Sequence, residues 1–379
     1  MCKIKHLFFF FFFFFFSFCN EDDFVLSSEN ISLYKPLLEN KNIALVVNQT
    51  SLINKTHLVD TLISLHLNLV KIFSPEHGFR GELDAGKAIN DTIDLNSGLP
   101  IISLYGKNIK PTMEHLKDID VILFDIQDVG ARFYTYISTL HYVMESASEN
   151  NIPLIILDRP NPNGHYCDGP VLDLKYKSFV GMHPVPVVHG MTIGEYAQMI
   201  NGEKWISKKC DLTVIPMINY NRKMFYSLPV KPSPNLPNSK SINLYPSLCF
   251  FEGTNISVGR GTDYPFQHFG APYLDYEYSF TPISGPGSKY PKYENQICFG
   301  IDLKNEKEYF SNINLKWLIK SYNECPDKNS FFNNFFDKLA GNDILRKQII
   351  SNMSIEDIKL SWQDDLSEFK EKRKKYLIY

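Results

Sequence analysis

The chain has 379 residues, of which 44% are hydrophobic and 21% are charged, and its formal net charge is −3. A chain of this length is too long for one ordinary hydrophobic core, so we expect two domains. The slightly negative charge provides no basic field for nucleic acid, and we expect no nucleic-acid partner.

The N-terminal segment predicts export. Lys3 and Lys5 precede an apolar run, dominated by phenylalanine, that extends from Leu7 to Phe18. This run is shorter than the roughly 20 residues of a membrane span and has no amphipathic period, so a buried core helix is a poor alternative. We interpret residues 1–19 as a secretory signal peptide.

Cys19 follows the apolar run directly and is itself followed by an acidic stretch. This arrangement resembles the surface-directed lipoproteins of the Bacteroidetes, in which such a cysteine carries the lipid. Phe18 argues against this interpretation, because both lipoprotein signals and ordinary cleavage sites prefer a small residue there. We expect an exported protein of the periplasm or outer membrane, touching the membrane only through a lipid anchor at Cys19.

The first half of the chain alternates strand and helix patterns. Short Val/Ile/Leu runs predict strands buried on both faces of a parallel sheet. These runs are Ile43–Val47, Leu69–Phe73, Ile101–Leu104, Val121–Phe124 and Leu154–Leu157. Helical patterns lie between them at His57–His66, Thr112–Lys117 and Thr139–Glu149. The alternation predicts a doubly wound α/β domain over residues 24–190.

The second half, residues 191–379, is expected to form a smaller α/β (α+β) domain. Thr192 and Glu195 form a capping-box pattern that opens a helix, which makes Glu195 structural. Prolines and glycines predict loops over residues 160–190 and 228–272. Ser361 is the predicted N-cap of a final helix, whose Trp362, Leu366 and Phe369 are spaced to pack inward. The remaining cysteines follow no CxxC spacing, so we predict neither a disulfide framework nor a zinc site; these are Cys167, Cys210, Cys249, Cys298 and Cys325.

Polar residues follow the predicted strands at their carboxyl ends, the edge where open α/β sheets bind ligands. In Ser74-Pro75-Glu76-His77-Gly78-Phe79-Arg80-Gly81, Glu76 is a candidate general acid, and an ion pair of Glu76 with Arg80 that only fixes the loop is the alternative. In Asp125-Ile126-Gln127-Asp128-Val129-Gly130-Ala131-Arg132, the carboxylates and amide are candidates for the same site. Arg132 is a candidate for binding a ligand carboxylate, whereas a structural Asp–Arg pair is the favoured alternative for Asp125.

Two further motifs carry polar side chains. The alternating Asn and Pro of Asp158-Arg159-Pro160-Asn161-Pro162-Asn163-Gly164 suit polyol recognition, or simply make a turn. The segment from Glu252 to Thr262 contains several glycines, but their order matches no phosphate loop, so we reject nucleotide binding and expect no cofactor. His183 and His189 lack the spacing of metal ligands, and no GxSxG or HExxH motif is present.

Several motifs in one order resemble a single family, the exo-β-N-acetylmuramidases of the NamZ type, first known as a domain of unknown function. The motifs are SPEHGFRG, DIQDVGARFYTY, DRPNPNG, HGMTIGE, PSPNLP and YPSLCFFEGTNISVGRGTDYPFQHFGAP. The similarity extends from about Ile43 to the C-terminus. It implies a Rossmann-like N-terminal domain, a smaller C-terminal domain and a cleft between them.

The resemblance also implies the reaction, which is release of N-acetylmuramic acid (MurNAc) from the non-reducing end of peptidoglycan fragments of the MurNAc-GlcNAc type, in cell-wall turnover and recycling. Glu76 is then the leading catalytic acid, with Asp125, Asp128 or Glu252 as its partner; alternatively, the 2-acetamido group of the substrate attacks. The implied substrate-binding residues are His77, Arg80, Gln127, Arg132, Tyr134, Arg159, Asn161, Asn163, Asn255, Ser257, Arg260, Thr262 and Gln267.

Arg132 and Arg260 are our candidates for reading the lactyl carboxylate, because arginine can bind it bidentately. The competing hypothesis is a non-catalytic, exported protein that binds cell-wall sugars in the same cleft without needing Glu76. Release of MurNAc from a chromogenic N-acetylmuramide distinguishes the two.

Overall fold

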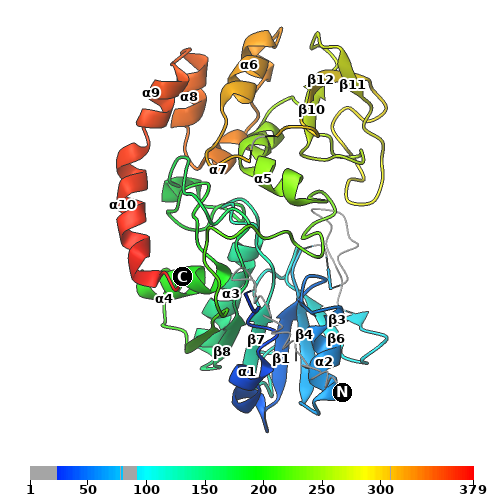
Figure 1. Cartoon of the computed structure of the whole chain (residues 1–379), viewed down its shortest axis with the longest axis vertical. Helices are drawn as coiled ribbons and strands as arrows, with labels where there is room; N and C mark the ends of the chain where they lie inside the picture. Colours follow the sequence, from blue (N-terminus) through cyan, green and yellow to red (C-terminus); the bar gives the residue numbers. More distant parts are fainter. Residues whose placement is uncertain (1–23, 77, 80–91, 308) are drawn as a thin grey trace, which may run out of the picture.

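A computed structural model describes residues 24–76, 78–79, 92–307 and 309–379, and it forms two α/β domains stacked along the long axis of the molecule (Figure 1). Within this part of the chain, no helix is long and apolar enough to cross a membrane.

The N-terminal domain is built on a seven-stranded sheet with the order β5-β6-β4-β1-β7-β8-β9. The strands in this order are β5 (Thr92–Ile93), β6 (Pro100–Ser103), β4 (Leu69–Ser74), β1 (Ile43–Val47), β7 (Val121–Asp125), β8 (Leu154–Leu157) and β9 (Leu212–Ile215). All neighbours pair in parallel except β5, which is antiparallel to β6. With the parallel strands numbered along the chain, the order reads 3-2-1-4-5-6, which confirms the predicted Rossmann-like, doubly wound architecture.

Alternation along each strand divides the core of this domain into two layers. Ile43, Leu45 and Val47 pack with α1 (Ile31–Leu38) and α2 (Leu58–Ser64), whereas Ala44 and Val46 pack in the cluster that contains α3 and α4. Helix α3 is Tyr136–Glu149 and helix α4 is Ile193–Gly202. Because successive side chains of a strand point to opposite faces, a continuous apolar run is what a sheet covered on both faces requires.

The C-terminal domain combines a small antiparallel sheet, of order β10-β12-β11, with short helices. Its strands are β10 (His268–Ala271), β11 (Tyr278–Phe280) and β12 (Cys298–Asp302). Its helices are α5 (Ser239–Leu248), the 3-10 helix η2 (Cys249–Gly253), α6 (Lys316–Glu324), α7 (Phe336–Ala340), α8 (Ile344–Ile350) and α9 (Ile355–Leu360). The mixture confirms the predicted α+β character of this half.

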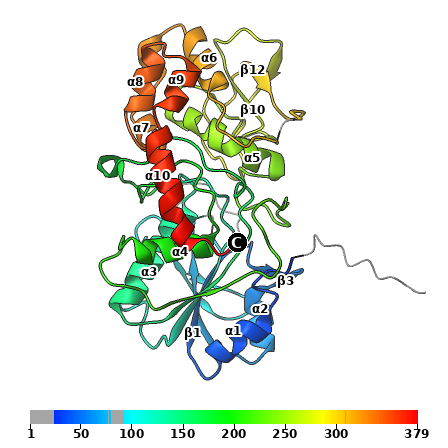
Figure 2. The same ribbon diagram turned by 60° about the vertical axis from the view of Figure 1, so that its left-hand side comes forward.

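The two domains share one hydrophobic core. A single cluster of buried residues includes Ile137 of α3, Leu244 of α5 and Phe336 of α7. The last helix, α10 (Gln363–Arg373), leaves the C-terminal domain and runs back to α4 of the N-terminal domain (Figures 1 and 2). Trp362, Leu366 and Phe369 are buried as predicted.

The predicted boundary between residues 190 and 191 is too early for the sheet. Strand β9 pairs with β8 from Leu154–Leu212 to Leu157–Ile215, and α4 packs against the same sheet domain. The N-terminal domain therefore includes residues as far as Ile215. The capping box of α4 is present, and Glu195 accepts hydrogen bonds from Thr192 and Arg222, which confirms its structural role.

Three local predictions differ from the structure. Residues 112–117 form turns rather than a helix, and Asp118, at φ 61°, leaves the helical region before a second turn can form. Ser361 donates to the Ile358 carbonyl at the end of α9, and α10 begins without a side-chain cap. The expected loop over residues 228–272 contains helix α5, which begins at an Asn238–Ser241 capping box.

Helix α5 continues through Pro246 because its lost hydrogen bond is replaced. Proline has no N–H, so the carbonyl of Ile242, four residues earlier, loses its helical donor. Asn163 of the N-terminal domain donates its Nδ2 to this carbonyl at 3.1 Å. A side chain distant in sequence therefore stabilises a helix whose proline predicts a loop.

Candidate active site

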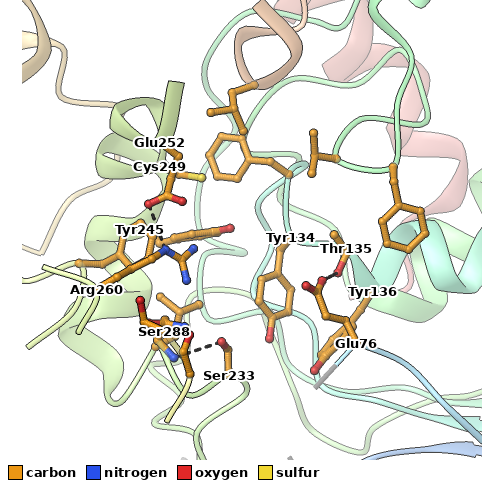
Figure 3. A pocket seen from close by; sticks show the side chains of 18 of the residues that line it. Glu76, Tyr134, Thr135, Tyr136, Ser233, Tyr245, Cys249, Glu252, Arg260 and Ser288 are labelled. Carbon is orange, nitrogen blue, oxygen red and sulfur yellow. Dashed lines mark hydrogen bonds and ion pairs between the residues drawn. The ribbon is translucent and has the colours of Figure 1, made fainter. Parts of the chain in front are cut away.

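A cavity of about 580 Å³ lies between the two domains. The N-terminal domain contributes Glu76 and the segment Phe133–Tyr136, while the C-terminal domain contributes Tyr245, Glu252 and Arg260. In Figure 3 Glu76 lies on one side of this pocket and the Glu252–Arg260 pair lies on the opposite side, with Tyr134 between them. The volume lies within the range of ordinary small-molecule sites.

Glu76 lies two residues beyond β4, at the carboxyl edge of the sheet. The Thr135 hydroxyl, which directly precedes α3, donates to Glu76 Oε2 at 2.7 Å. Burial, and then the nearby Glu76 carboxylate, raise the pKa of the Tyr105 hydroxyl, so this phenol keeps its proton beside Glu76. The strand end, a helix start and a phenol thus position one half-buried carboxyl group toward the pocket.

Glu252 and Arg260 form an ion pair on the facing wall. Arg260 Nε donates to Glu252 Oε1 at 3.0 Å, and the guanidinium lies 5.1 Å from the centroid of the Phe266 ring. Burial opposes the charge on Arg260, but Glu252 raises its pKa, and the side chain stays ionised. Among the described residues, no acceptor pairs with the two Nη groups of Arg260, which leaves a planar pair of donors for a ligand.

Aromatic side chains form much of the pocket between these walls. Tyr134 and Tyr136 contact each other edge-on at 4.8 Å, and both donate to the Pro232 carbonyl, at 2.8 and 3.1 Å. Tyr245 packs against Phe133 and Phe266. Burial raises the pKa of the neighbouring Cys249 thiol, so it is not a thiolate nucleophile.

Asp125 and Arg159 do not line the pocket. Arg159 Nη2 donates to Asp125 Oδ2 at 2.8 Å, and both side chains are almost fully buried under the sheet edge. This buried pair is the structural alternative favoured for Asp125, and it accounts for Arg159 as well. We therefore remove both residues from the candidate site.

Asp128 does not line the pocket either, and its side chain is buried. The Gly130 N–H donates to its Oδ2 at 2.7 Å, and its Oδ1 is buried without a hydrogen-bond partner. Burial raises its pKa to about 7. His189, 4.0 Å away, offers no positive charge, since burial, Arg373 and Arg132 lower the pKa of its imidazole to about 3.

This shifted pKa predicts that Asp128→Asn stabilises the protein at high pH. The folded state holds the Asp128 proton more tightly than the unfolded chain does. The stability that this proton contributes is therefore fully present below about pH 4 and is lost as the pH rises through about 7. We expect the free energy of unfolding of Asp128→Asn, relative to the original protein, to rise by about 2–3 kcal/mol between pH 5 and pH 8. Urea denaturation at both pH values measures this difference, and a difference independent of pH would contradict it.

Arg132 is fully buried and does not line the pocket. Its Nη1 donates to the carbonyls of Pro170 and Val185, and its Nη2 donates to those of Leu339 and Ala340, all at 2.7–2.8 Å. The prediction that Arg132 binds a ligand carboxylate is therefore wrong, because the side chain is fully buried away from the pocket and both of its Nη groups are already bound to backbone carbonyls. Instead, the residue joins the N-terminal domain to the C-terminal end of α7.

The amides of the first domain are likewise structural. Gln127 Nε2 donates to the Pro160 carbonyl at 2.6 Å, and Asn161 Nδ2 donates to the Met191 carbonyl at 2.9 Å. Asn163 donates to the carbonyls of Val129 and Ile242. All three side chains are buried and hold loops together, as the turn interpretation expects for the Asn-Pro segment.

Four predicted residues of the second domain support the wall rather than line it. Asn255 accepts from Tyr273 at 2.6 Å, and Ser257 accepts from the Gly259 N–H at 3.2 Å. Thr262 donates to the Gly259 carbonyl at 2.7 Å, and Gln267 accepts from Asn238 at 3.1 Å. These bonds fix the loop that carries Arg260.

Of the predicted residues, the pocket thus unites Glu76, Tyr134, Glu252 and Arg260, while His77 and Arg80 lie outside the described residues. Sequence reasoning missed other lining residues, among them Tyr105, Thr135, Tyr136, Ser233, Asn235, Tyr245, Ser288, Lys289 and Tyr290. Several of these lie inside the quoted motifs, whose aromatic and hydroxyl residues were the available signal. The turn with Ser288, Lys289 and Tyr290 lies in no motif.

Two carboxylates on facing walls of an aromatic pocket, between two α/β domains, are the arrangement typical of a glycoside hydrolase. Residues 43–240 match the family described as exo-β-N-acetylmuramidase NamZ, N-terminal, and residues 243–379 match its C-terminal counterpart. The chain belongs to this family of exo-β-N-acetylmuramidases.

Individual relatives agree with the family assignment. The chain is 42% identical over 371 residues to the peptidoglycan β-N-acetylmuramidase NamZ of Bacillus subtilis, covering 91% of this chain and 89% of that protein. A crystal structure of a DUF1343 family protein from Bacteroides fragilis has a TM-score of 0.88 at 47% identity, over 94% of this chain and 99% of that one. A second DUF1343 structure from the same species has a TM-score of 0.83 at 30% identity, with the same coverage.

Proposed function

We propose that this protein is an exo-acting peptidoglycan hydrolase that releases MurNAc from the non-reducing end of fragments of the MurNAc-GlcNAc type. The observation that carries the proposal is the pair Glu76 and Glu252 on facing walls of one pocket. Glycosidases generally use two carboxylates that flank the bond to be cleaved. Membership of the exo-β-N-acetylmuramidase family supports this reaction.

The exposure of the lining aromatic residues supports exo action. Phe133, Tyr245 and Phe266 form one buried cluster of rings, whereas Phe335 and Tyr290 are 38% and 81% exposed. A pocket with a closed end accepts the terminal sugar of a chain and leaves the next sugar toward the opening. We therefore assign the buried end to MurNAc and the exposed end to the leaving sugar.

Glu76 is the proposed general acid. It is half-buried and accepts a hydrogen bond from Thr135, an environment that holds one carboxyl group in a fixed orientation. Of the three carboxylates considered as its partner, Glu252 alone shares the pocket, because Asp125 is paired with Arg159 and Asp128 is buried outside the pocket lining.

Incubation with MurNAc-GlcNAc and with a chromogenic N-acetylmuramide tests the proposed function. An exo-muramidase releases free MurNAc from the first substrate and the chromophore from the second. A binding protein that retains the cleft binds the disaccharide and releases neither product. Longer glycans that yield internal fragments before MurNAc would contradict exo action.

Arg260 is the proposed reader of the lactyl carboxylate, which distinguishes MurNAc from N-acetylglucosamine. Its two Nη groups face the pocket, and a planar fork binds a carboxylate where lysine cannot. We expect Arg260→Lys to lower kcat/KM on the muramide by about ten- to a hundredfold, the value of one charged hydrogen bond of about 1.5–3 kcal/mol.

The matched measurement for Arg260→Lys uses the corresponding N-acetylglucosaminide, on which any activity of the original protein should barely change. The lysine keeps a positive charge beside Glu252, so loss of this carboxylate's counter-ion is not the cause of the effect. An equal loss on both sugars would mean that Arg260 serves only to hold Glu252.

Export, periplasmic or outer-membrane location and lipidation at Cys19 remain part of the proposal, supported by the sequence of residues 1–23, which lie outside the described residues. Replacement of Cys19 with serine followed by cell fractionation tests the anchor. Unchanged membrane association in that variant would contradict it.

A further inference from the structure

Tyr290 is an exposed aromatic residue at the opening of the pocket. Its side chain is 81% exposed although it lines the cavity, and the Lys289 ammonium lies 5.3 Å from its ring centroid. An apolar ring left in water gains free energy when a ligand covers it. A residue that lines the cavity and is so exposed can contact the part of a substrate that projects from the pocket.

The turn that carries Tyr290 is fixed to the pocket wall. Gly285 and Ser288 form an antiparallel bridge, with N–O distances of 3.1 and 3.0 Å, and Asn235 Nδ2 donates to the Gly287 carbonyl at 2.8 Å. Gly287 has a φ of 82°, and a Cβ there would lie 2.5 Å from Pro234 Cβ. Only glycine therefore fits, and the turn lies directly against the segment that contributes Ser233 and Asn235 to the pocket.

A tyrosine that follows a fixed turn suits a sugar better than a long, flexible side chain would. A tyrosine has few rotatable bonds, so little conformational entropy is lost when a ligand covers its ring. A pyranose presents an apolar C–H face that can cover an aromatic ring, while its hydroxyls and acetamido group remain in water. The buried end of the pocket is assigned to MurNAc, so the ring at the exposed end meets the next sugar.

We propose that Tyr290 is the stacking platform of a leaving-group subsite, which holds the N-acetylglucosamine ring on the far side of the cleaved bond. The assignment rests on the proposed function, since the direction of the chain follows from exo action. The carboxylates and Arg260 act on MurNAc and on the cleaved bond, whereas Tyr290 would bind the sugar that leaves.

The test compares two substrates that share MurNAc and an alcohol leaving group but differ in the second ring. They are the MurNAc-GlcNAc disaccharide and methyl β-N-acetylmuramide. Removing a covered ring face lowers affinity by about ten- to thirtyfold, so Tyr290→Ala should lower kcat/KM by this factor on the disaccharide and far less on the methyl glycoside. Tyr290→Phe, which keeps the ring, should retain most of the activity on both.

A control variant separates the effect of this ring from that of any exposed aromatic side chain. Phe225→Ala removes another exposed aromatic residue, 64% exposed and outside the pocket lining, and should change the activity on neither substrate. Equal losses on both substrates in Tyr290→Ala, or no loss on the disaccharide, would overturn the subsite.

Binding of the uncleaved disaccharide distinguishes this proposal from the proposed function. Calorimetric titration in the Glu76→Gln background should show ten- to thirtyfold weaker binding when Tyr290→Ala is added. If the original protein released no MurNAc from either substrate, the proposed function would fail, while this titration would still decide whether Tyr290 binds the second sugar. Unchanged affinity would overturn the subsite.

Discussion

Replacing Glu76 with glutamine should lower the turnover of MurNAc-GlcNAc by about 10²–10⁴, the usual contribution of general acid catalysis. Glutamine keeps the size of the side chain and can still accept the hydrogen bond from Thr135, which lies 2.7 Å from Glu76 Oε2. It cannot transfer a proton to the leaving oxygen. The disaccharide, whose leaving group is an alcohol, depends most on this proton.

A substrate with an acidic leaving group provides the internal control for Glu76. A nitrophenyl N-acetylmuramide needs little protonation, so Glu76→Gln should lose much less activity on it than on the disaccharide. Glu145→Gln, which changes a glutamate paired with Lys110 far from the pocket lining, should leave both activities unchanged. Disaccharide turnover at the original rate in Glu76→Gln would remove Glu76 from the role of acid.

The agreement between sequence and structure is best where burial follows from the pattern. The runs Ile43–Val47 and Leu154–Leu157 become β1 and β8 with the predicted bounds, because a strand covered on both faces must be apolar throughout. Glu76 could be found by the same reasoning, since the carboxyl ends of parallel strands meet at one edge. The family resemblance then predicted a cleft between domains.

The same reasoning does not predict which polar residues at that edge face the pocket. Asp125 is the last residue of β7 and Glu76 lies two residues beyond β4, yet Asp125 is 0% exposed and paired with Arg159, while Glu76 faces the pocket. A motif indicates that a side chain is near the edge, but its partner comes from a loop distant in sequence. The same limit applies to α5, whose Pro246 is tolerated because Asn163 supplies the missing donor.

Replacement of Arg132 should also have a large effect, but on the stability of the protein rather than on catalysis. Its guanidinium is 0% exposed and donates to four backbone carbonyls, two of which belong to Leu339 and Ala340 at the C-terminal end of α7. Gly341 follows them at φ 81°, and a Cβ there would lie 2.7 Å from Arg132 Nη2. The helix end is therefore shaped around this arginine, which also places a positive charge where the helix dipole favours one.

We expect Arg132→Met to lower the free energy of unfolding by about 3–5 kcal/mol, because buried carbonyls lose their donors at the junction of the two domains. Arg346→Met is the matched control. Arg346 of α8 pairs with Asp337 of α7, but its side chain is 31% exposed, and loss of such a pair should cost less than about 1 kcal/mol. Urea denaturation of both variants measures the contrast.

Activity measurements on the Arg132 variants complete this test. Leu339 of α7 lines the pocket, so a displaced helix should affect muramide and glucosaminide turnover equally. Arg132→Lys keeps the charge, but its ammonium has three donors on one nitrogen and cannot reach four carbonyls spread along a planar fork, so it should be destabilised nearly as much as Arg132→Met. A variant with the original stability and a selective loss on the muramide would instead mean that Arg132 reads the substrate carboxylate, and that its contacts with α7 are replaceable.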